Sequence, residues 1–195
     1  MFLINCSVAP QNISSLFGNE KHETNLGFQA NTYGTTIHAD DPNDKYSPEW
    51  GPYCASPISI NLSYNFTKNI IILPFLGFDG IGTTICYNSN DINISGLFLE
   101  KSFFNKSIGY GLQTSFKLGI PIFLNLDYFT GYMYESTNDF FSWYDPKYII
   151  QMKMILKPSV TFRLSNYGFD VGALCDLHSK QFAFYLGLNC QLNIR

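Results

Sequence analysis

The sequence predicts an all-β fold: a closed, antiparallel up-and-down β-barrel of eight to ten strands, with ten preferred. Three observations predict it. Apolar and polar residues alternate strictly along most of the chain after Thr24, and no run of about 18 apolar residues suits a spanning helix. The two longest connections also fall on the same end of such a barrel, with short turns on the other.

The N-terminal region, residues 1–23, is expected to be a tether, and residues 24–195 the barrel domain. Residues 7–23 are polar, rich in Ser and Asn, and suit a tether or lid. Leu3-Ile4-Asn5-Cys6 is similar to the end of a bacterial lipobox, so Cys6 is a candidate for lipidation. That interpretation requires a start further upstream, because no basic region precedes the short apolar run. The alternative is an ordinary start with a chance cysteine.

The first strands follow from period two. Residues 58–66 carry Ile, Leu, Tyr and Phe at even positions and Ser and Asn at odd ones, which gives each strand one apolar and one polar face. Residues 69–78 and 82–88, joined by a hairpin near 79–80, complete a count of ten if they are separate strands. Merging or losing weak strands gives eight.

The alternation is weakest at residues 91–102. Leu97 and Leu99 are out of phase with Ile94. A bulge inserts one residue and shifts the phase by one, so we expect a bulge near Gly96.

The C-terminal half contains the clearest strands, at 108–118, 147–163, 167–177 and 181–194. In the last of these, every even position is apolar. Pro158 lacks the backbone N–H that a ladder requires, so a bulge or a break is expected there.

The longest connections, residues 38–55 and 135–146, fall on one end of the predicted barrel, and both termini fall on the other. These loops carry the two tryptophans, Trp50 and Trp143. Each stands beside Tyr and Pro, so each is a candidate anchor for an external partner; the alternative is an aromatic at the membrane interface.

Composition decides between a barrel in water and a barrel in lipid. The chain is 46% hydrophobic but only 14% charged, about half the charge of a soluble domain. The polar faces carry Gly, Ser, Asn, Gln and Tyr, which suit a narrow lumen better than a solvated surface. The apolar faces are then expected to contact lipid. The net charge of −3 and the lack of a Lys/Arg cluster exclude a nucleic-acid binder.

Four charged residues share the parity of the polar faces and form a predicted lumen network: Asp127, Lys153, Lys157 and Asp170. If loop 135–146 joins Tyr134 to Lys147, Asp127 falls opposite or next to Lys153. If the turn at 164–166 is tight, Lys157 lies diagonal to Asp170. Cross-strand neighbours stand about 4.5–5.5 Å apart at Cβ, a distance that a lysine side chain covers.

From Thr24 to Arg195 the pattern resembles the small outer-membrane β-barrel proteins of Gram-negative bacteria. The resemblance is architectural and points to no particular family. It implies a location in the bacterial outer membrane and contact with the lipid bilayer. The chain departs from many such proteins in ending Leu192-Asn193-Ile194-Arg195 rather than in an aromatic residue.

Three classes of function remain. The first, which we favour, is a structural or surface-interaction barrel with a lumen filled by side chains and loops 38–55 and 135–146 as contact sites. The second is a soluble, lipocalin-like carrier of a small apolar ligand. The third is an outer-membrane enzyme acting on lipid, for which His178-Ser179 is the sole candidate pair. We expect no catalytic residue and no cofactor, because no catalytic constellation appears beyond this weak pair. We expect no metal, because the five cysteines are widely spaced without a CxxC motif.

Overall fold

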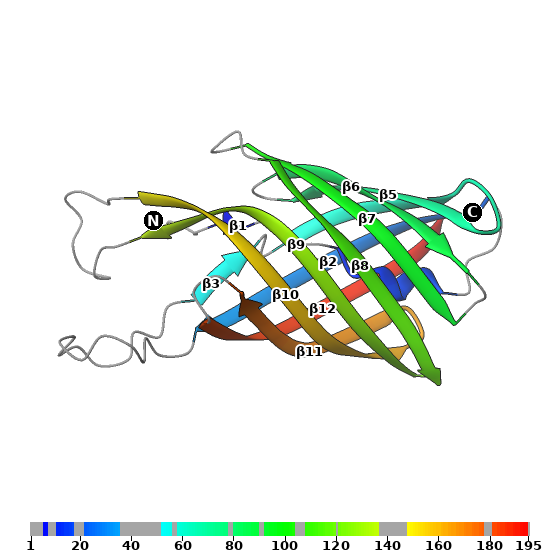
Figure 1. Cartoon of the computed structure of the whole chain (residues 1–195). Coiled ribbons are helices and arrows are strands. Elements are labelled where there is room, and N and C mark those ends of the chain that lie inside the picture. Colours follow the sequence, from blue (N-terminus) through cyan, green and yellow to red (C-terminus); the bar gives the residue numbers. More distant parts are fainter. Residues whose placement is uncertain are drawn as a thin grey trace.

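Ten strands form one closed antiparallel barrel (Figure 1). The structure, a computed structural model, describes residues 6–7, 11–17, 22–35, 52–55, 58–77, 80–89, 92–103, 108–119, 121–136, 148–177 and 181–194. The barrel strands are β2 (Thr24–Thr35), β4 (Ile58–Asn65), β5 (Ile70–Gly77), β6 (Gly80–Asn88), β7 (Asn93–Ser102), β8 (Ile108–Gly119), β9 (Ile122–Ser136), β10 (Tyr148–Leu164), β11 (Tyr167–Asp176) and β12 (Gln181–Ile194). Each pairs with the next along the chain, and β2 pairs with both β12 and β4, which closes the sheet. The predicted fold class and the preferred count of ten strands are confirmed.

Two short strands and one short helix lie outside this ring of pairings. The strand β1 (Cys6–Ser7) pairs in parallel with β3 (Pro52–Ala55), and β3 pairs with the end of β2 at Tyr33 and Gly34. The 3-10 helix η1 (Ile13–Leu16) is a single turn. In the part of the chain that the structure describes, no helix is long and apolar enough to cross a membrane.

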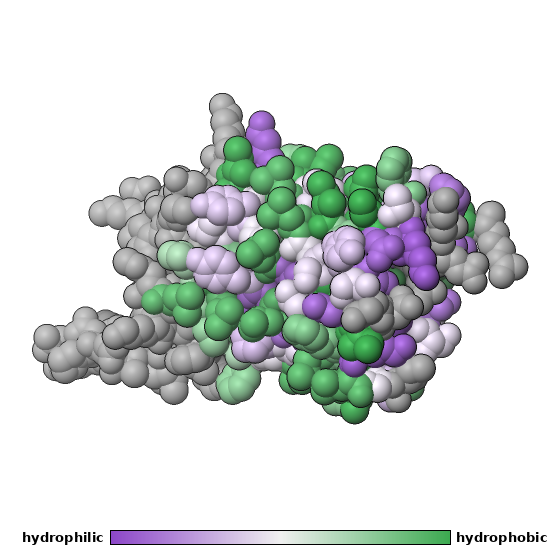
Figure 2. Space-filling model, turned by 45° about the vertical axis from the view of Figure 1, so that its right-hand side comes forward, coloured by the Kyte–Doolittle hydropathy of each residue, from purple (hydrophilic) through white to green (hydrophobic). Residues whose placement is uncertain are grey.

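Strict alternation along the strands separates an outer from an inner face. In β4, Ile58 and Ile60 are 63% and 44% exposed, whereas Ser59 and Ser63 between and beyond them are almost fully buried. Successive strand residues point to opposite faces, so in β4 the apolar residues at even positions line the outside and the small polar residues between them line the lumen. Figure 2 shows apolar side chains spread widely over the face of the barrel that it presents.

The expected bulge near Gly96 is absent, and this prediction is corrected. The pairings of β7 with β6 and with β8 run through Gly96 without a shift. The phase changes for a different reason: Ile94 points into the lumen and is fully buried, whereas Leu97 points outward and is 55% exposed. An apolar residue therefore lies on the inner face at this position.

Pro158 also causes no bulge. It stands opposite Leu126 in a continuous β9–β10 ladder. On its other side, the β10–β11 pairs stop at Leu156 and resume at Ser159 in the same register. The missing N–H thus interrupts the ladder locally without moving the strand, so the expectation of a break holds and that of a bulge does not.

The two ends of the barrel differ as the sequence predicted, with one exception for the termini. The end of β12 at Ile194 lies beside the start of β2 at Thr24, next to the short turns. The pairing of β1 with β3, by contrast, puts Cys6 and Ser7 at the end of the long loops. The first described residues therefore lie at the loop end, not at the turn end where both termini were expected.

Candidate functional site: the plugged lumen

The N-terminal segment Gln11–Phe17, which we call the plug, lies inside the barrel. All seven of its side chains are buried, which differs from the tether or lid expected over residues 7–23. Asn12 is the N-cap of the turn η1, and its Oδ1 accepts hydrogen bonds from Ser14 N at 2.8 Å and Ser14 Oγ at 2.6 Å. Asparagine is a preferred residue at this position because its side chain satisfies an otherwise unpaired backbone N–H.

Asn12 also joins the plug to the barrel wall. Its backbone N donates to Gln29 Oε1 at 2.7 Å. Its side-chain Nδ2 donates to Thr161 Oγ1 at 3.1 Å and to the Asp170 carboxylate. One residue thus links the plug to β2, β10 and β11.

Gln11 is held by side chains on two further strands, β4 and β8. Ser59 Oγ and Asn61 Nδ2 donate to Gln11 Oε1 at 3.0 and 3.2 Å. Gln113 Nε2 donates to the Gln11 carbonyl at 2.6 Å. These polar side chains on β4 and β8 satisfy backbone and side-chain groups that would otherwise be buried unpaired, at a cost of about 1–3 kcal/mol each.

The far end of the plug is held by an arginine. Arg163 Nη1, on β10, donates to the carbonyl of Ser15 at 2.7 Å and to that of Ser14 at 3.3 Å. Carbonyls at the end of a helical turn have no partner within the turn. Arg163 therefore supplies a charged donor where the plug leaves two acceptors.

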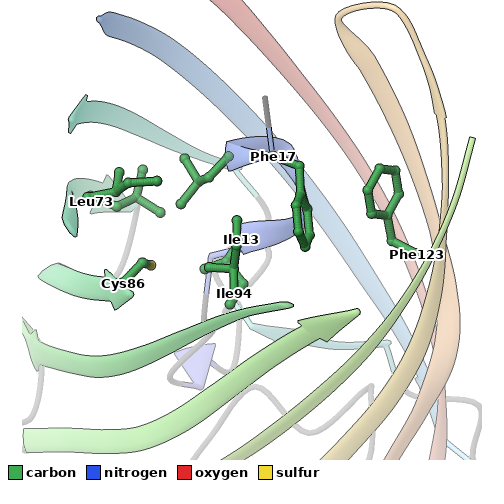
Figure 3. Packing of buried hydrophobic residues seen from close by; sticks show 8 residues of the cluster. Ile13, Phe17, Leu73, Cys86, Ile94 and Phe123 are labelled. Atoms are coloured by element: carbon green, nitrogen blue, oxygen red, sulfur yellow. The ribbon is translucent and has the colours of Figure 1, made fainter. Parts of the chain in front are cut away.

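The other side of the plug is apolar and packs against an apolar part of the wall (Figure 3). The phenyl rings of Phe17 and Phe123 stack with centroids 5.2 Å apart. The whole cluster comprises Ile13, Leu16, Phe17, Ile71, Leu73, Cys86, Ile94 and Phe123. This contact accounts for the apolar inner-face residues Ile71 and Leu73 on β5 and Ile94 on β7. A second inner-face cluster, Phe75, Phe98, Phe129 and Ile155, contains no plug residue.

A buried ion pair lies beside the plug. Lys157 Nζ stands 2.9 Å from Asp127 Oδ2, and the two side chains are 2% and 4% exposed. The ammonium also lies 4.4 Å from the centroid of the Tyr185 ring, a cation–π contact. A buried pair of this kind costs desolvation energy and keeps its place through such additional partners.

Asp170 is a wall residue that binds both the plug and neighbouring wall residues. Its carboxylate accepts hydrogen bonds from Asn12, from Thr161 Oγ1, from Tyr185 Oη at 3.4 Å and from Asn189 Nδ2 at 3.3 Å. Neutral donors thus surround this carboxylate.

The structure brings together three of the four charged residues expected in the lumen but pairs them differently. In the β9–β10 ladder Asp127 lies opposite Lys157, and Lys153 lies opposite Gly131. The expected pairing of Asp127 with Lys153 is therefore corrected to a pairing with Lys157. Asp170 lies opposite Thr161 and accepts from neutral groups, as described above. The long loop 135–146 did not fix the register of this hairpin.

Several residues of the sequence analysis lie outside the described part of the chain. Trp50, Trp143 and the pair His178-Ser179 are among them, as are most of loops 38–55 and 135–146. Cys6 is described as part of β1.

The sequence analysis missed the plug residues and their receptors on the wall. Gln113 and Tyr185 had the parity of the polar faces but no distinguishing charge. A signal for the plug did exist: Asn12 is followed by apolar residues at Ile13, Leu16 and Phe17, the spacing of a helical turn after an N-cap. It was too short to stand out within a polar segment.

The gap beside Asn12 and Ile13, bounded on the wall by Asp127 and Lys157, has no room for a bound molecule. Among the described residues, no three His, Cys, Asp or Glu side chains are placed to hold a metal ion.

Aromatic side chains gather toward both ends of the outer face. Near the short turns, the exposed aromatic residues are Phe66, Tyr87 and Tyr167. Toward the long loops they are Phe103, Tyr110 and Phe184. Two aromatic girdles on either side of an apolar band are typical of barrels that span a membrane.

These features define the class of protein. A closed antiparallel barrel with an even number of strands, an apolar exterior, a polar interior, short turns on one end and long loops on the other is the architecture of bacterial outer-membrane β-barrels. The chain resembles these proteins as a group.

No protein-family model matches the sequence, and no curated protein sequence matches it. Among solved structures, the attachment invasion locus protein Ail of Yersinia pestis is similar with a TM-score of 0.40 and 9% identity, over 89% of this chain and 100% of that one. The N-terminal β-barrel domain of OprF from Pseudomonas aeruginosa gives 0.37 and 8%, over 88% and 98%. The ten-stranded closure of the present chain rests on its own strand pairings.

Proposed function

We propose that the chain is a bacterial outer-membrane barrel with a structural or surface-interaction role, whose lumen is closed by its own plug. Loops 38–55 and 135–146 serve as contact sites outside the cell, with Trp50 and Trp143 as anchors, and the lipid bilayer is the partner of the outer face. No catalytic residue and no cofactor are assigned.

The observation that carries this proposal is the occupied lumen. A barrel of about eight strands is filled by its own side chains, and ten strands enclose somewhat more space. Here small inner-face residues such as Ser59 and Asn61 leave that space, and the plug occupies it. A channel needs an open path, and a carrier needs an apolar cavity. The interior around Asn12 offers neither.

Conductance across a planar lipid bilayer tests the closure. The wild-type protein should insert without a steady ionic current. A variant in which residues 11–17 are replaced by a Gly/Ser linker of equal length should conduct, because the linker cannot fill the lumen. The matched control carries the same replacement at residues 38–44 and should stay closed. A steady current through the wild-type protein contradicts the proposal.

Protease added to intact cells tests the orientation of the loops. Cleavage is expected first within 38–55 and 135–146. Cleavage confined to the turn at 164–166 would put the opposite end outside and remove the proposed contact sites.

A further inference from the structure

Cys6 and Cys54 are partners in the ladder between β1 and β3. Neighbouring strands lie about 4.7–4.9 Å apart, and residues in register share a face of the sheet. A disulfide requires Cα atoms about 4.4–6.8 Å apart. The backbone register alone therefore meets the distance that a disulfide needs.

We propose that Cys6 and Cys54 form a disulfide that fastens the N-terminal segment to the loop end of the barrel. The three other cysteines, Cys86, Cys175 and Cys190, are free thiols. The odd count of five thus divides into one pair and three thiols on barrel strands. Proteins exported across the bacterial periplasm fold in an oxidising compartment in which disulfides persist.

The position of this pair relative to the plug gives the disulfide a role. On the turn side, the plug continues into the barrel wall, where His22 N donates to the Asn65 carbonyl at 3.1 Å. On the loop side, Cys6 precedes the plug by only a few residues. A covalent bond to Cys54 would close a ring through β2 and hold the plug at both ends, so that it cannot slide out. This role rests on the closed lumen proposed above.

The chemistry balances with one oxidant. The two thiols give up two protons and two electrons, and a bond forms between the two sulfur atoms. The electrons reduce the disulfide of a thiol-oxidising protein to two thiols. Lipidation of Cys6 would consume the same sulfur as a thioether. The disulfide and the lipid anchor are therefore mutually exclusive at this residue.

Peptide mapping of the full chain tests the bond. The protein is exported to the outer membrane, its free thiols are blocked with N-ethylmaleimide during extraction in detergent, and it is digested without reductant. The expected product is a peptide containing Cys6 linked to one containing Cys54, lighter by about 2 Da than the two reduced peptides together. The linked product should be lost on reduction and in both Cys6→Ser and Cys54→Ser. It should persist in the control Cys190→Ser.

Three outcomes overturn the proposal: both cysteines blocked by maleimide, Cys6 recovered as a lipid thioether, or Cys54 linked to a different cysteine. A second measurement tests the role. Adding a reductant should raise the frequency of transient current openings in the wild-type protein. The Cys6→Ser variant should show this higher frequency already without reductant, and the reductant should not change it. A linked peptide with no effect of reduction overturns the role of the bond in holding the plug. A linked peptide in a protein that conducts steadily refutes the closed lumen but not the bond.

Discussion

The lumen wall formed by β5 to β7 differs from the wall formed by β10 to β12 and β2. The first presents Ile71, Leu73 and Ile94 to the interior, and the second presents Thr161 and Asp170. Both walls are apolar on the outside. The plug matches this difference, because its apolar side chains lie against the first wall and Asn12 donates its hydrogen bonds to the second. An enclosed segment of a few residues can thus be specified by an asymmetric wall.

The largest expected effect comes from breaking the polar wall at its ion pair. Asp127→Leu strands the ammonium of Lys157 in a buried site and should lower the free energy of unfolding by about 3–5 kcal/mol. Adding Lys157→Met should recover most of this loss, whereas adding Lys153→Met should not. Urea unfolding of the protein in lipid vesicles measures all three. If Lys153→Met restores stability as well as Lys157→Met does, the β9–β10 register is wrong.

The apolar wall is tested by Leu16→Ala. Leu16 is fully buried in the cluster with Ile71 and Leu73, so the loss of packing should cost about 2–5 kcal/mol. The control Leu164→Ala removes the same atoms from a side chain that is 73% exposed and should change stability little. Equal effects of the two changes would mean that the plug does not pack against β5 to β7. Thermal unfolding in detergent gives the comparison.

The outer faces of the two walls should behave alike. Leu97→Arg on β7 and Leu186→Arg on β12 each put a charge on an exposed apolar position near the middle of a strand. Each should lower the free energy of unfolding in a bilayer by about 2–4 kcal/mol. Gly187→Ala, next to Leu186 but inside, acts by steric contact instead, since an added Cβ would meet Tyr185 Oη at 2.4 Å. Spin labels at positions 186 and 187 that report the same environment would contradict this assignment.

The smallest effect is expected for Asn12→Ala on the polar side of the plug. The change removes an N-cap and the donor to Thr161 and Asp170, and caps contribute about 0.5–2 kcal/mol. Asn12→Asp keeps the cap but faces Asp170 with a second carboxylate, so it should destabilise the protein more than alanine does. The control is Asn193→Ala, which is exposed. Hydrogen exchange at the backbone of residues 12–15 reports the loosening directly, and an Asp variant milder than the Ala variant would rule out the contact with Asp170.

The alternating pattern predicted most of the barrel because strand geometry ties it directly to the two faces. The sequence of β4 or β12 therefore specifies both strand and orientation. The pattern failed where a third partner changed the inner face: Ile94 looked out of phase because the plug, not the wall, required it to be apolar. A local phase change was read as a bulge, although a buried partner produces the same signal.

The lumen residues were predictable by type but not by pairing. Parity placed Asp127 and Lys157 on the inner face. Their register depended on how far β9 extends into the connection, and Ser136, which was assigned to the loop from the sequence, pairs with Tyr148. A two-residue turn fixes register, whereas a long loop does not. Gln113 and Asn12 were missed because neutral amides are common throughout this chain, and nothing in the sequence distinguishes those that hydrogen-bond inside the lumen.

The path of the N-terminal segment constrains the order in which the molecule is built. The chain passes from β1 at one mouth, through the interior at Asn12, to the start of β2 at the other mouth. If β12 and β2 had already paired, the N-terminal segment would have to be threaded through the closed barrel. A folded domain fused ahead of Cys6 would be too wide to pass through. We expect the strands to close around the segment instead. The pairing of β12 with β2 would then be the last to form.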